Sequence, residues 1–422
     1  MNRHSRAARA PNANPHTREK GARRICVTCA RLGRGCARMR LMRIVIVGGG
    51  IGGLAAALAM RREGLAPEVY ERAPALLEVG AAIAVWPNAF TVLERLGLAD
   101  TVLARAGRIE HARWLARDGR LYNHFDFPST ARPAVALHRA DLQGALLHAL
   151  PPESVHLGKS FVEFDARGEE VSARFDDGAD VACDVLIGAD GLHSRVRAQL
   201  LGDGEPVYRG YNVWRGVARL EHASLEAHTA SEVYGEGRRF GIGPVGLGRT
   251  GWWATANEPE ASTESAYEHG PKLSRMFEGW LAPVRELIEA TPSETILRNA
   301  AYDRPASARW SVGRVTLLGD AIHPMTPNLG QGGCVAIEDA AVLARCLSKY
   351  ADARAALRAY ESRRRTRAAR IASYSRRYGV FGQWHSRAAT RMRARLLSYV
   401  PQSFGRRLLS LVFDYDAYEV EI

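Results

Sequence analysis

The chain has 422 residues, 46% of them hydrophobic and 24% charged, which is ordinary for a globular protein and long enough for two domains. Its net charge of +13 suggests nucleic-acid binding, but residues 1–41 alone carry +10, from ten Arg and one Lys against one Glu. The remainder holds 47 basic and 44 acidic residues, so its charge of +3 argues against a nucleic-acid-binding protein.

Residues 1–41 are rich in Arg, Ala, Asn and Pro and show little apolar periodicity. This composition predicts a disordered basic extension or an over-extended start of the chain. Cys26 and Cys29, with Cys36 seven residues further on, could form part of a zinc site, but a second ligand pair at proper spacing is missing. We therefore predict no metal site.

Residues 43–70 predict a βαβ unit. A β run at 43–47 precedes a glycine turn at 48–53, a helical pattern at 54–62 and a second β run at 68–70. The uncharged run at 44–60 is short for a membrane span and has five glycines within six positions, so we predict no membrane segment.

Gly48, Gly50 and Gly53 form the pattern G-x-G-x-x-G in this unit, and Glu71 follows 23 residues after Gly48. Such glycines let a pyrophosphate approach the helix N-terminus, while the acid accepts a hydrogen bond from a ribose hydroxyl. The pattern alone leaves NAD, NADP and FAD open, although Glu71 disfavours a 2′-phosphate. Two further copies, at 241–246 and 246–251, have no helix after them and are interpreted as hairpin turns.

The rest of the chain predicts a β-rich region followed by helices. Short strands are expected around 161–175 and at 185–187, and strand-like runs at 212–220, 231–242 and 250–256 indicate an inserted antiparallel sheet. A strand at 314–318 precedes helices at 335–347 and 352–378, with more helix to about residue 413. Three scattered cysteines in apolar surroundings favour a reducing cytoplasm: Cys183, Cys334 and Cys346.

The stretch GDAIHPMTPNLGQGGC, at residues 319–334, lies between that last strand and its helix. A glycine-rich approach to a helix N-terminus directs backbone N–H groups toward an electron-rich ligand. Taken alone, the stretch is equally compatible with a Gly/Pro turn that caps the helix.

Three segments in this order resemble the class A flavoprotein aromatic hydroxylases, related to salicylate and 4-hydroxybenzoate hydroxylases. They are the glycine pattern at 48–53, DVLIGADGLHSRVR at 184–197 and the stretch at 319–333; HRADLQGALL at 138–147 matches a further helix of these proteins. The resemblance runs from residue 42 to about 413. It implies FAD, transient docking of NAD(P)H, and hydroxylation of a small aromatic or heteroaromatic substrate by dioxygen through a flavin hydroperoxide.

The resemblance also implies an α/β fold, with a Rossmann-like FAD-binding domain, an inserted antiparallel-sheet substrate domain and C-terminal helices. The expected boundaries are a basic extension at 1–41, the FAD-binding domain at 42–207 and 311–379, the substrate domain at 208–310 and the C-terminal helices at 380–422. It leaves the chain a monomer or a homodimer.

The resemblance assigns residues to the cofactor and to the reaction. Expected FAD contacts are Gly48, Gly50, Gly53, Glu71, Arg72, Arg139, Gln143, Asp190, Asp320, Gly330, Gln331, Gly332 and Gly333. Asp320 is expected at the ribityl chain and Asp190 between flavin and nicotinamide, although a plain Asp-Gly turn remains open for Asp190. Pro327 and Gly330 would shape the loop where flavin meets oxygen and substrate. His323 and Cys334 are interpreted as structural.

GAAIAVWPNA at 80–89 and GEGRRF at 235–240 resemble the urate hydroxylase branch, in which an arginine at the position of Arg239 holds the substrate. Asn328 stands where that branch has an aspartate, and a tyrosine near 251–252 is absent, which disfavours urate. Strand alternation predicts Arg238 and Arg239 on opposite faces. We predict that Arg239 faces the substrate, with a wall from Trp214, Trp252 or Trp253; two solvated arginines are the alternative.

The sequence leaves three alternatives to hydroxylation: an FAD-dependent reductase of the same fold, a non-catalytic flavin-binding protein and a nucleic-acid-binding protein. The arginines of the helix at 352–378 lack an aromatic stacking platform, so a solvated helix face is favoured over a nucleic-acid surface.

Overall fold

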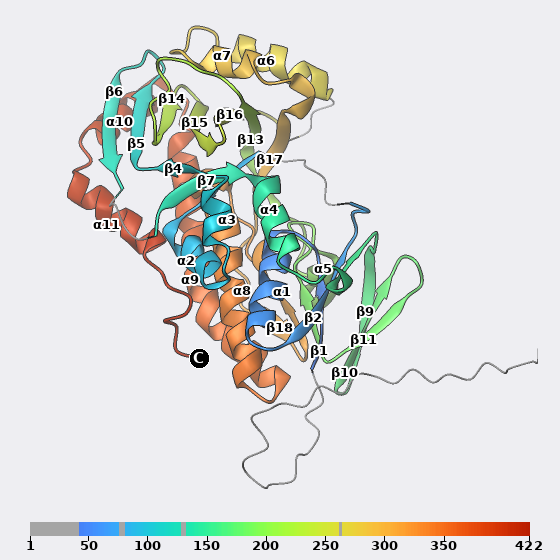
Figure 1. The fold of residues 1–422 in the computed structure, drawn as a ribbon. Helices are drawn as coiled ribbons and strands as arrows, with labels where there is room; N and C mark the ends of the chain where they lie inside the picture. The colour runs from blue at the N-terminus through green and yellow to red at the C-terminus, as the bar shows by residue number, and fades with distance from the viewer. Residues whose placement is uncertain (1–41, 76–80, 128–131, 261–263) are drawn as a thin grey trace, which may run out of the picture. The chain divides into compact units, whose positions relative to one another are not determined.

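A computed structural model describes residues 42–75, 81–127, 132–260 and 264–422 (Figure 1). The predicted basic extension, with Cys26, Cys29 and Cys36, lies outside the described residues. None of the helices in the described ranges is both long and apolar enough to cross a membrane.

The first sheet has six strands in the order β18-β19-β12-β1-β2-β8. Its strands are β1 (Arg43–Val47), β2 (Ala66–Glu71), β8 (Val155–Leu157), β12 (Val185–Gly188), β18 (Ser311–Val312) and β19 (Val315–Leu317). All neighbours pair in parallel except β18 and β19. The predicted βαβ unit is therefore confirmed, with α1 (Ile51–Arg62) as its crossover helix.

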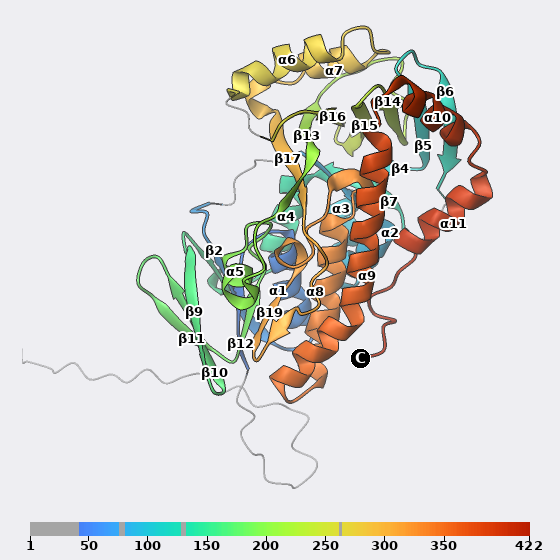
Figure 2. The same cartoon turned by 180° about the vertical axis from the view of Figure 1, so that it is seen from behind.

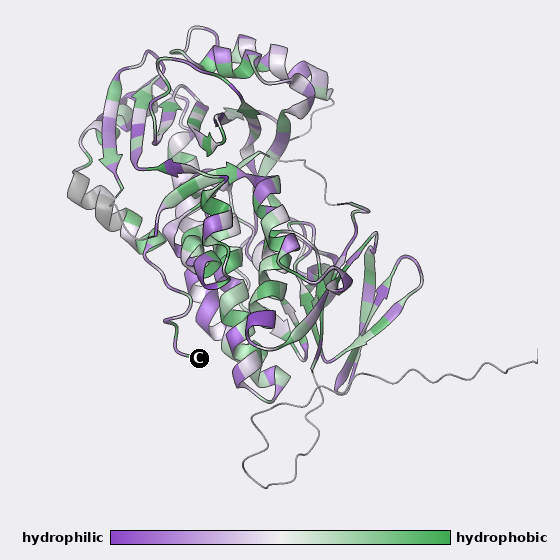
Figure 3. Cartoon of the chain, in the orientation of Figure 1, coloured by the Kyte–Doolittle hydropathy of each residue, from purple (hydrophilic) through white to green (hydrophobic). Residues whose placement is uncertain are grey.

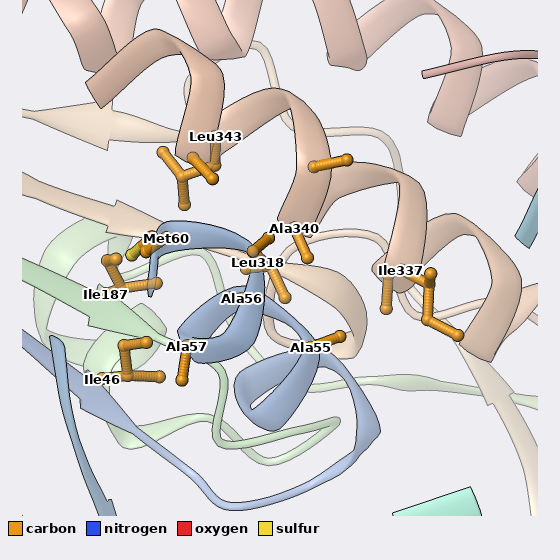
Figure 4. Packing of buried hydrophobic residues seen from close by; sticks show 14 of the residues in the cluster. Ile46, Ala55, Ala56, Ala57, Met60, Ile187, Leu318, Ile337, Ala340 and Leu343 are labelled. Carbon is orange, nitrogen blue, oxygen red and sulfur yellow. The ribbon is translucent and has the colours of Figure 1, made fainter. Parts of the chain in front are cut away.

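Helix α1 lies between this sheet and α8 (Gly332–Lys349), as Figure 4 shows. Its alanines are fully buried because small side chains let the two helices approach closely. A Cβ added at Gly52 would lie 2.8 Å from Leu318 Cδ2 and 3.2 Å from Ala336 Cβ. The hydrophobic character of α1 is visible in Figure 3. The glycines of this unit thus serve the packing of the two helices as well as the turn.

The second sheet has seven strands in the order β17-β13-β16-β15-β14-β5-β6. Its strands are β5 (His111–Ala116), β6 (Leu121–Asp126), β13 (Val207–Ala218), β14 (Thr229–Tyr234), β15 (Arg238–Gly246), β16 (Arg249–Asn257) and β17 (Leu297–Asp303). The expected antiparallel sheet is present, and the predicted run at 231–242 is a hairpin of two strands. The turn interpreted at 246–251 is the β15–β16 turn. The interpretation of 241–246 as a turn is wrong, because Gly241 and Gly243 lie inside β15 and pair with β16.

Two strands of this sheet come from an unexpected part of the chain. β5 and β6 lie within the range expected to build the cofactor domain, yet β5 pairs in parallel with β14. Such pairing of distant segments leaves no local signal in the sequence. The domain boundaries themselves stay a prediction.

Two small sheets and several helices complete the described chain. The sheets are β11-β10-β9 (Asp180–Cys183, Glu170–Phe175, Phe161–Arg167) and β3-β7-β4 (Ala82–Val85, Ala134–His138, Gly107–Ile109). The remaining helices are α2 (Pro87–Arg95), α3 (Ala99–Leu103), α4 (Arg139–His148), α5 (Arg195–Leu201), α6 (His269–Met276), α7 (Val284–Glu289), α9 (Ala353–Gly382), α10 (Arg387–Ser398) and α11 (Gln402–Phe413). Figure 2 shows the 30-residue α9 running alongside α8.

Candidate active site

The turn after β1 needs glycine at two positions and leaves a third open. Gly48 has φ +111°, and a Cβ there would lie 2.4 Å from the Ala189 carbonyl oxygen. A Cβ at Gly53 would lie 1.9 Å from the Gly48 carbonyl oxygen. At Gly50 φ is −72°, and a Cβ would meet no atom of the described residues within 4 Å. Among the described residues no side chain caps α1, so its first N–H groups face the space beside Gly50.

Glu71 and Gln143 are both tied to this turn. The Glu71 carboxylate accepts from the N–H of Gly49 at 2.6 Å and from the N–H of Ala73 at 2.9 Å. Gln143 Nε2, on α4, donates to the Gly49 carbonyl at 2.8 Å. Neighbouring Arg72 is exposed. The turn is therefore held from β2 and α4, which keeps the space beside it open.

Arg139 begins α4 and is exposed. The N-terminal end of a helix carries partial positive charge, so a cation there is unfavourable without an anion nearby. Burial raises the pKa of Asp320, and the charges of His323 and Arg139 oppose this rise. A Cβ at Gly332 would lie 3.7 Å from Asp320 Oδ1, so Asp320 adjoins the start of α8.

The predicted loop before α8 is compact and ends in an open helix terminus. Short 3-10 turns at Gly319–Ala321 and Pro327–Leu329 lead to Gly330, which has φ +60°. A Cβ at Gly330 would lie 3.0 Å from Trp86 Nε1. Within the part of the chain that the structure describes, no side chain caps α8, and its first turn has no acidic residue. Its first N–H groups are therefore suited to an anionic or electron-rich ligand.

Asp190 acts as a local cap. Its carboxylate accepts from Ser194 Oγ at 2.5 Å and from the N–H groups of Arg195 and Val196 at 2.8 and 3.2 Å, at the start of α5. Burial raises the pKa of Asp190, and these hydrogen bonds oppose the rise. The carboxylate is thus engaged within the protein, and its expected role between flavin and nicotinamide stays a prediction.

Arg239 is buried and Arg238 is exposed, as strand alternation predicts. Arg239 donates Nε to Gln383 Oε1 at 2.9 Å and Nη2 to Asn328 Oδ1 at 2.6 Å, and its Nη1 pairs with Glu232 at 2.8 Å. The alternative of two solvated arginines is therefore wrong. Asn328 belongs to the turn at Pro327–Leu329, so Arg239 reaches the loop that holds Pro327 and Gly330.

The three candidate tryptophans separate by face. Trp214 and Trp252 are buried with Phe240 in the apolar cluster under α6 and α7. Trp253 lies on the other face, where the Arg239 guanidinium carbon is 5.2 Å from its ring centroid. Of the three, only Trp253 can form a wall on the Arg239 side.

Arg215 is a residue of this face that the sequence interpretation missed. It lies directly opposite Trp253 in the β13–β16 ladder and is half-buried. Its Nη1 donates to Asn299 Oδ1 at 3.0 Å, and within the described ranges it forms no ion pair. Burial, together with Arg139, lowers the pKa of Arg215. Trp214 points into the apolar cluster, so the two-residue period of a strand places the next residue, Arg215, on the opposite face. This alternation is the sequence signal that could have identified Arg215.

The arginines of α9 do not form a purely solvated face. Arg364 is fully buried, and its Nη2 and Nε lie 2.6 Å from Glu338 and Asp339, which are also fully buried. His323 Nε2 contacts Asp339 Oδ2 at 2.5 Å. The interpretation of a solvated face is wrong at this position because carboxylates on α8 compensate the buried charge. Other members, including Arg365, Arg370 and Arg377, are exposed.

This charged cluster also holds the start of α8. Asn88 Nδ2 donates to Glu338 Oε1 at 2.5 Å and to Gln331 Oε1 at 3.0 Å. Burial raises the pKa of the Cys334 thiol to about 12, in keeping with the structural interpretation of that cysteine. The residues around the helix terminus are therefore rigidly placed.

Glu71 and Gln143 hold the turn beside Gly50, and Gly52 at the start of α1 packs against Leu318 and Ala336, close to Asp320 and the start of α8. We call this series of groups, from Glu71 to the α8 terminus, the path. An acid at one end, a helix N-terminus in the middle and a second helix N-terminus at the other end fit a long dinucleotide of the FAD type. The residues present therefore fit the expected cofactor.

Comparisons with known proteins agree with this arrangement. The family model described as FAD binding domain matches residues 42–375. Aurachin C monooxygenase/isomerase of Stigmatella aurantiaca is 42% identical over 359 residues, covering 84% of this chain and 93% of that protein. FAD-dependent urate hydroxylase of Klebsiella pneumoniae is 36% identical over 330 residues, covering 76% and 86%. The structure of Klebsiella pneumoniae HpxO with FAD and uric acid superposes with a TM-score of 0.82 at 32% identity, covering 88% and 96%.

Proposed function

The chain belongs to the FAD-dependent monooxygenases that share the FAD binding domain, and we propose that it uses NAD(P)H and dioxygen to hydroxylate a small aromatic or heteroaromatic substrate. The observation that carries the proposal is the path from Glu71 to the α8 terminus, with the Arg239 loop beside its far end. Oxygen transfer is favoured over reduction because the similar proteins are named monooxygenases and hydroxylases.

On the cofactor side, a bound FAD supplies hydride acceptance and activation of dioxygen. The α1 terminus beside Gly50 would hold its pyrophosphate and Glu71 its ribose. Asp320 would bind the ribityl chain, and the N–H groups from Gly332 on would stabilise negative charge at the ring. The further expected contacts of this side are Arg72, Arg139, Gln143, Asp190, Gly330, Gln331 and Gly333.

On the substrate side, Arg239 would position the loop at Pro327–Gly330 through Asn328, in addition to its predicted substrate contact. Glu232 neutralises much of its charge. Among the described residues, the hydrogen-bond partner of Arg215 is the neutral Asn299. We therefore propose that Arg215 receives the anionic or carbonyl group of the substrate while Trp253 covers the ring. The three described cysteines are free and buried, which supports the proposed reducing cytoplasm.

The first test measures oxidation of NADH and NADPH in air by the FAD-reconstituted protein. Aurachin C comes first, because the relative named for it is more similar over more of the chain, and uric acid comes second. Aromatic acids, N-heteroaromatics and quinolones complete the panel. We expect one compound to stimulate oxidation and to gain one oxygen atom from labelled dioxygen. Stimulation with full release of hydrogen peroxide and no label in the product would contradict oxygen transfer.

Replacing Arg215 with methionine is expected to raise the KM of the active substrate about ten- to a hundredfold, because a charge-assisted contact contributes about 1.5–3 kcal/mol. FAD affinity should not change. Arg238→Met is the matched control, since Arg238 is exposed on the opposite face. Steady-state kinetics and FAD titration check both variants. A wild-type KM in Arg215→Met would show that this cation does not meet the substrate.

A further inference from the structure

Helix α10 carries apolar side chains on its outer face. Met392 is 50% and Leu396 48% exposed, and Tyr399, just after the helix, is 83% exposed. With the exposed Ala388, their spacing of four, four and three residues places them in one stripe. A surface helix normally turns such a stripe toward the core. The stripe of α10, defined here as Ala388, Met392, Leu396 and Tyr399, does the opposite.

A row of cations runs beside this stripe. Arg387, Arg391 and Arg395 are four residues apart and exposed, and within the described ranges none of them forms an ion pair. From residue 386 to residue 413 the chain has six arginines and no acidic residue. The positive charge of this region is therefore not balanced locally, whereas the body from residue 42 on is near neutral.

The orientation of α10 is imposed by its inner face. Arg393 is 2% exposed and donates to the carbonyls of Gly382 and Gly235, both at 2.5 Å. Asn123 Nδ2, on β6, donates to the carbonyls of Leu397 and Val400 at 3.0 and 2.8 Å. These contacts, at the middle and at the C-terminal end of the helix, hold its inner face against the protein, so the stripe faces outward. Figure 2 shows α10 beside β6.

We propose that the outer face of α10 is a docking surface for a membrane with anionic lipids. A helix with an apolar face flanked by arginines lies in the headgroup region, where the apolar side chains enter the acyl boundary and the cations meet phosphates. Tyrosine suits this boundary because its ring is apolar and its hydroxyl is polar. The argument for this occupant is charge complementarity. A second copy fits less well, because two-fold pairing would bring like-charged arginine rows together.

Docking would bring the substrate side close to the bilayer. Arg393 binds the carbonyl of Gly382, and a Cβ at Gly382 would lie 2.8 Å from Arg239 Cζ. The next residue, Gln383, accepts from Arg239 Nε. Only this short segment separates the docking surface from the Arg239 network. This inference rests on the proposed function and adds a substrate class to it, namely an amphiphilic aromatic compound that partitions into the membrane.

The test is co-sedimentation of the full chain with phosphatidylcholine vesicles, with and without phosphatidylglycerol. We expect binding only to the anionic vesicles, and weaker binding as salt is raised. Replacing Arg387, Arg391 and Arg395 together by glutamine should weaken binding about a hundredfold, since each arginine near such a surface contributes roughly a factor of five. Replacing Met392, Leu396 and Tyr399 together by serine should weaken it about as much.

The matched control replaces Arg365, Arg370 and Arg377, exposed on α9, by glutamine. It removes the same amount of charge from another surface, so binding to anionic vesicles should persist. Any contribution of residues 1–41 to vesicle binding is the same in this variant as in wild type. Equal weakening in the control, or no binding to anionic vesicles, would overturn the proposal; in the second case an acidic protein would be the better partner for this face. Thermal denaturation verifies that all variants fold.

The substrate class is tested separately. The Arg387/Arg391/Arg395 variant should oxidise a vesicle-dissolved substrate more slowly than wild type and a water-dissolved substrate equally well. Equal rates on both would refute the link between docking and substrate delivery. Vesicle binding needs no turnover, so an absence of oxygenation would count against the proposed function and leave the docking surface intact.

Discussion

Replacing Gly50 with valine is expected to abolish FAD retention without unfolding the protein. A Cβ at Gly50 would meet no atom of the residues that the structure describes within 4 Å, and φ is −72°, so valine is accommodated by the fold. Its side chain would instead occupy the space beside the α1 terminus, where the pyrophosphate is proposed to bind. Loss of the N–H contacts to a charged group, at about 1.5–3 kcal/mol each, should raise the Kd for FAD about a hundredfold or more.

The absorbance of flavin retained on purification and a fluorescence titration with FAD measure this effect. Gly144→Val is the matched control, because a Cβ there would lie no closer than 3.9 Å to His148, which is not one of the proposed FAD contacts. Asp320→Ala tests the other end of the path and should also lower FAD affinity. Gly53→Ala should lower stability itself, since its Cβ would lie 1.9 Å from a carbonyl oxygen. Stoichiometric flavin of unchanged affinity in Gly50→Val would refute the site assignment.

Replacing Arg364 with methionine is expected to lower the free energy of unfolding by about 3–5 kcal/mol, because two buried carboxylates each lose a charged partner. Arg367 still pairs with Glu338 at 2.8 Å and His323 with Asp339 at 2.5 Å, so Arg364 is one of two basic partners for each carboxylate. Glu338 and Asp339 are both fully buried and both lie 2.6 Å from this guanidinium. Urea denaturation at neutral pH measures the loss. Arg370→Met, on the exposed side of α9, is the control and should change stability little.

The pH dependence gives this prediction a second readout. Interactions with His323 and Arg364 outweigh desolvation and lower the pKa of Asp339 in the folded protein. In wild type, this stabilisation is present above the ordinary carboxyl pKa and is lost as pH falls through the lowered value. Without Arg364 the folded-state pKa of Asp339 rises, so protonation in mild acid relieves the buried charge. The deficit of Arg364→Met should therefore be larger at pH 7 than in mild acid; a constant deficit would contradict it.

The features that the sequence predicted well depend on neighbours along the chain. The turn after β1 requires glycine because Gly48 adopts a positive φ and Gly53 approaches the Gly48 carbonyl, and both constraints act within six residues. The opposite faces of Arg238 and Arg239 follow from the two-residue period of a strand. Such local geometry is written directly into the order of residues.

The features that only the tertiary structure decided join residues far apart. Arg239 meets Asn328 and Gln383, 89 and 144 residues away, and only these contacts show that its charge is engaged within the protein. Arg364 was expected in water because charged residues are usually exposed, yet carboxylates 25 and 26 residues earlier compensate its burial. The parallel pairing of β5 with β14 likewise joins two strands that lie far apart along the chain. Periodicity reports which face of one element is buried; which partner covers that face depends on packing between elements, and no local pattern carries it.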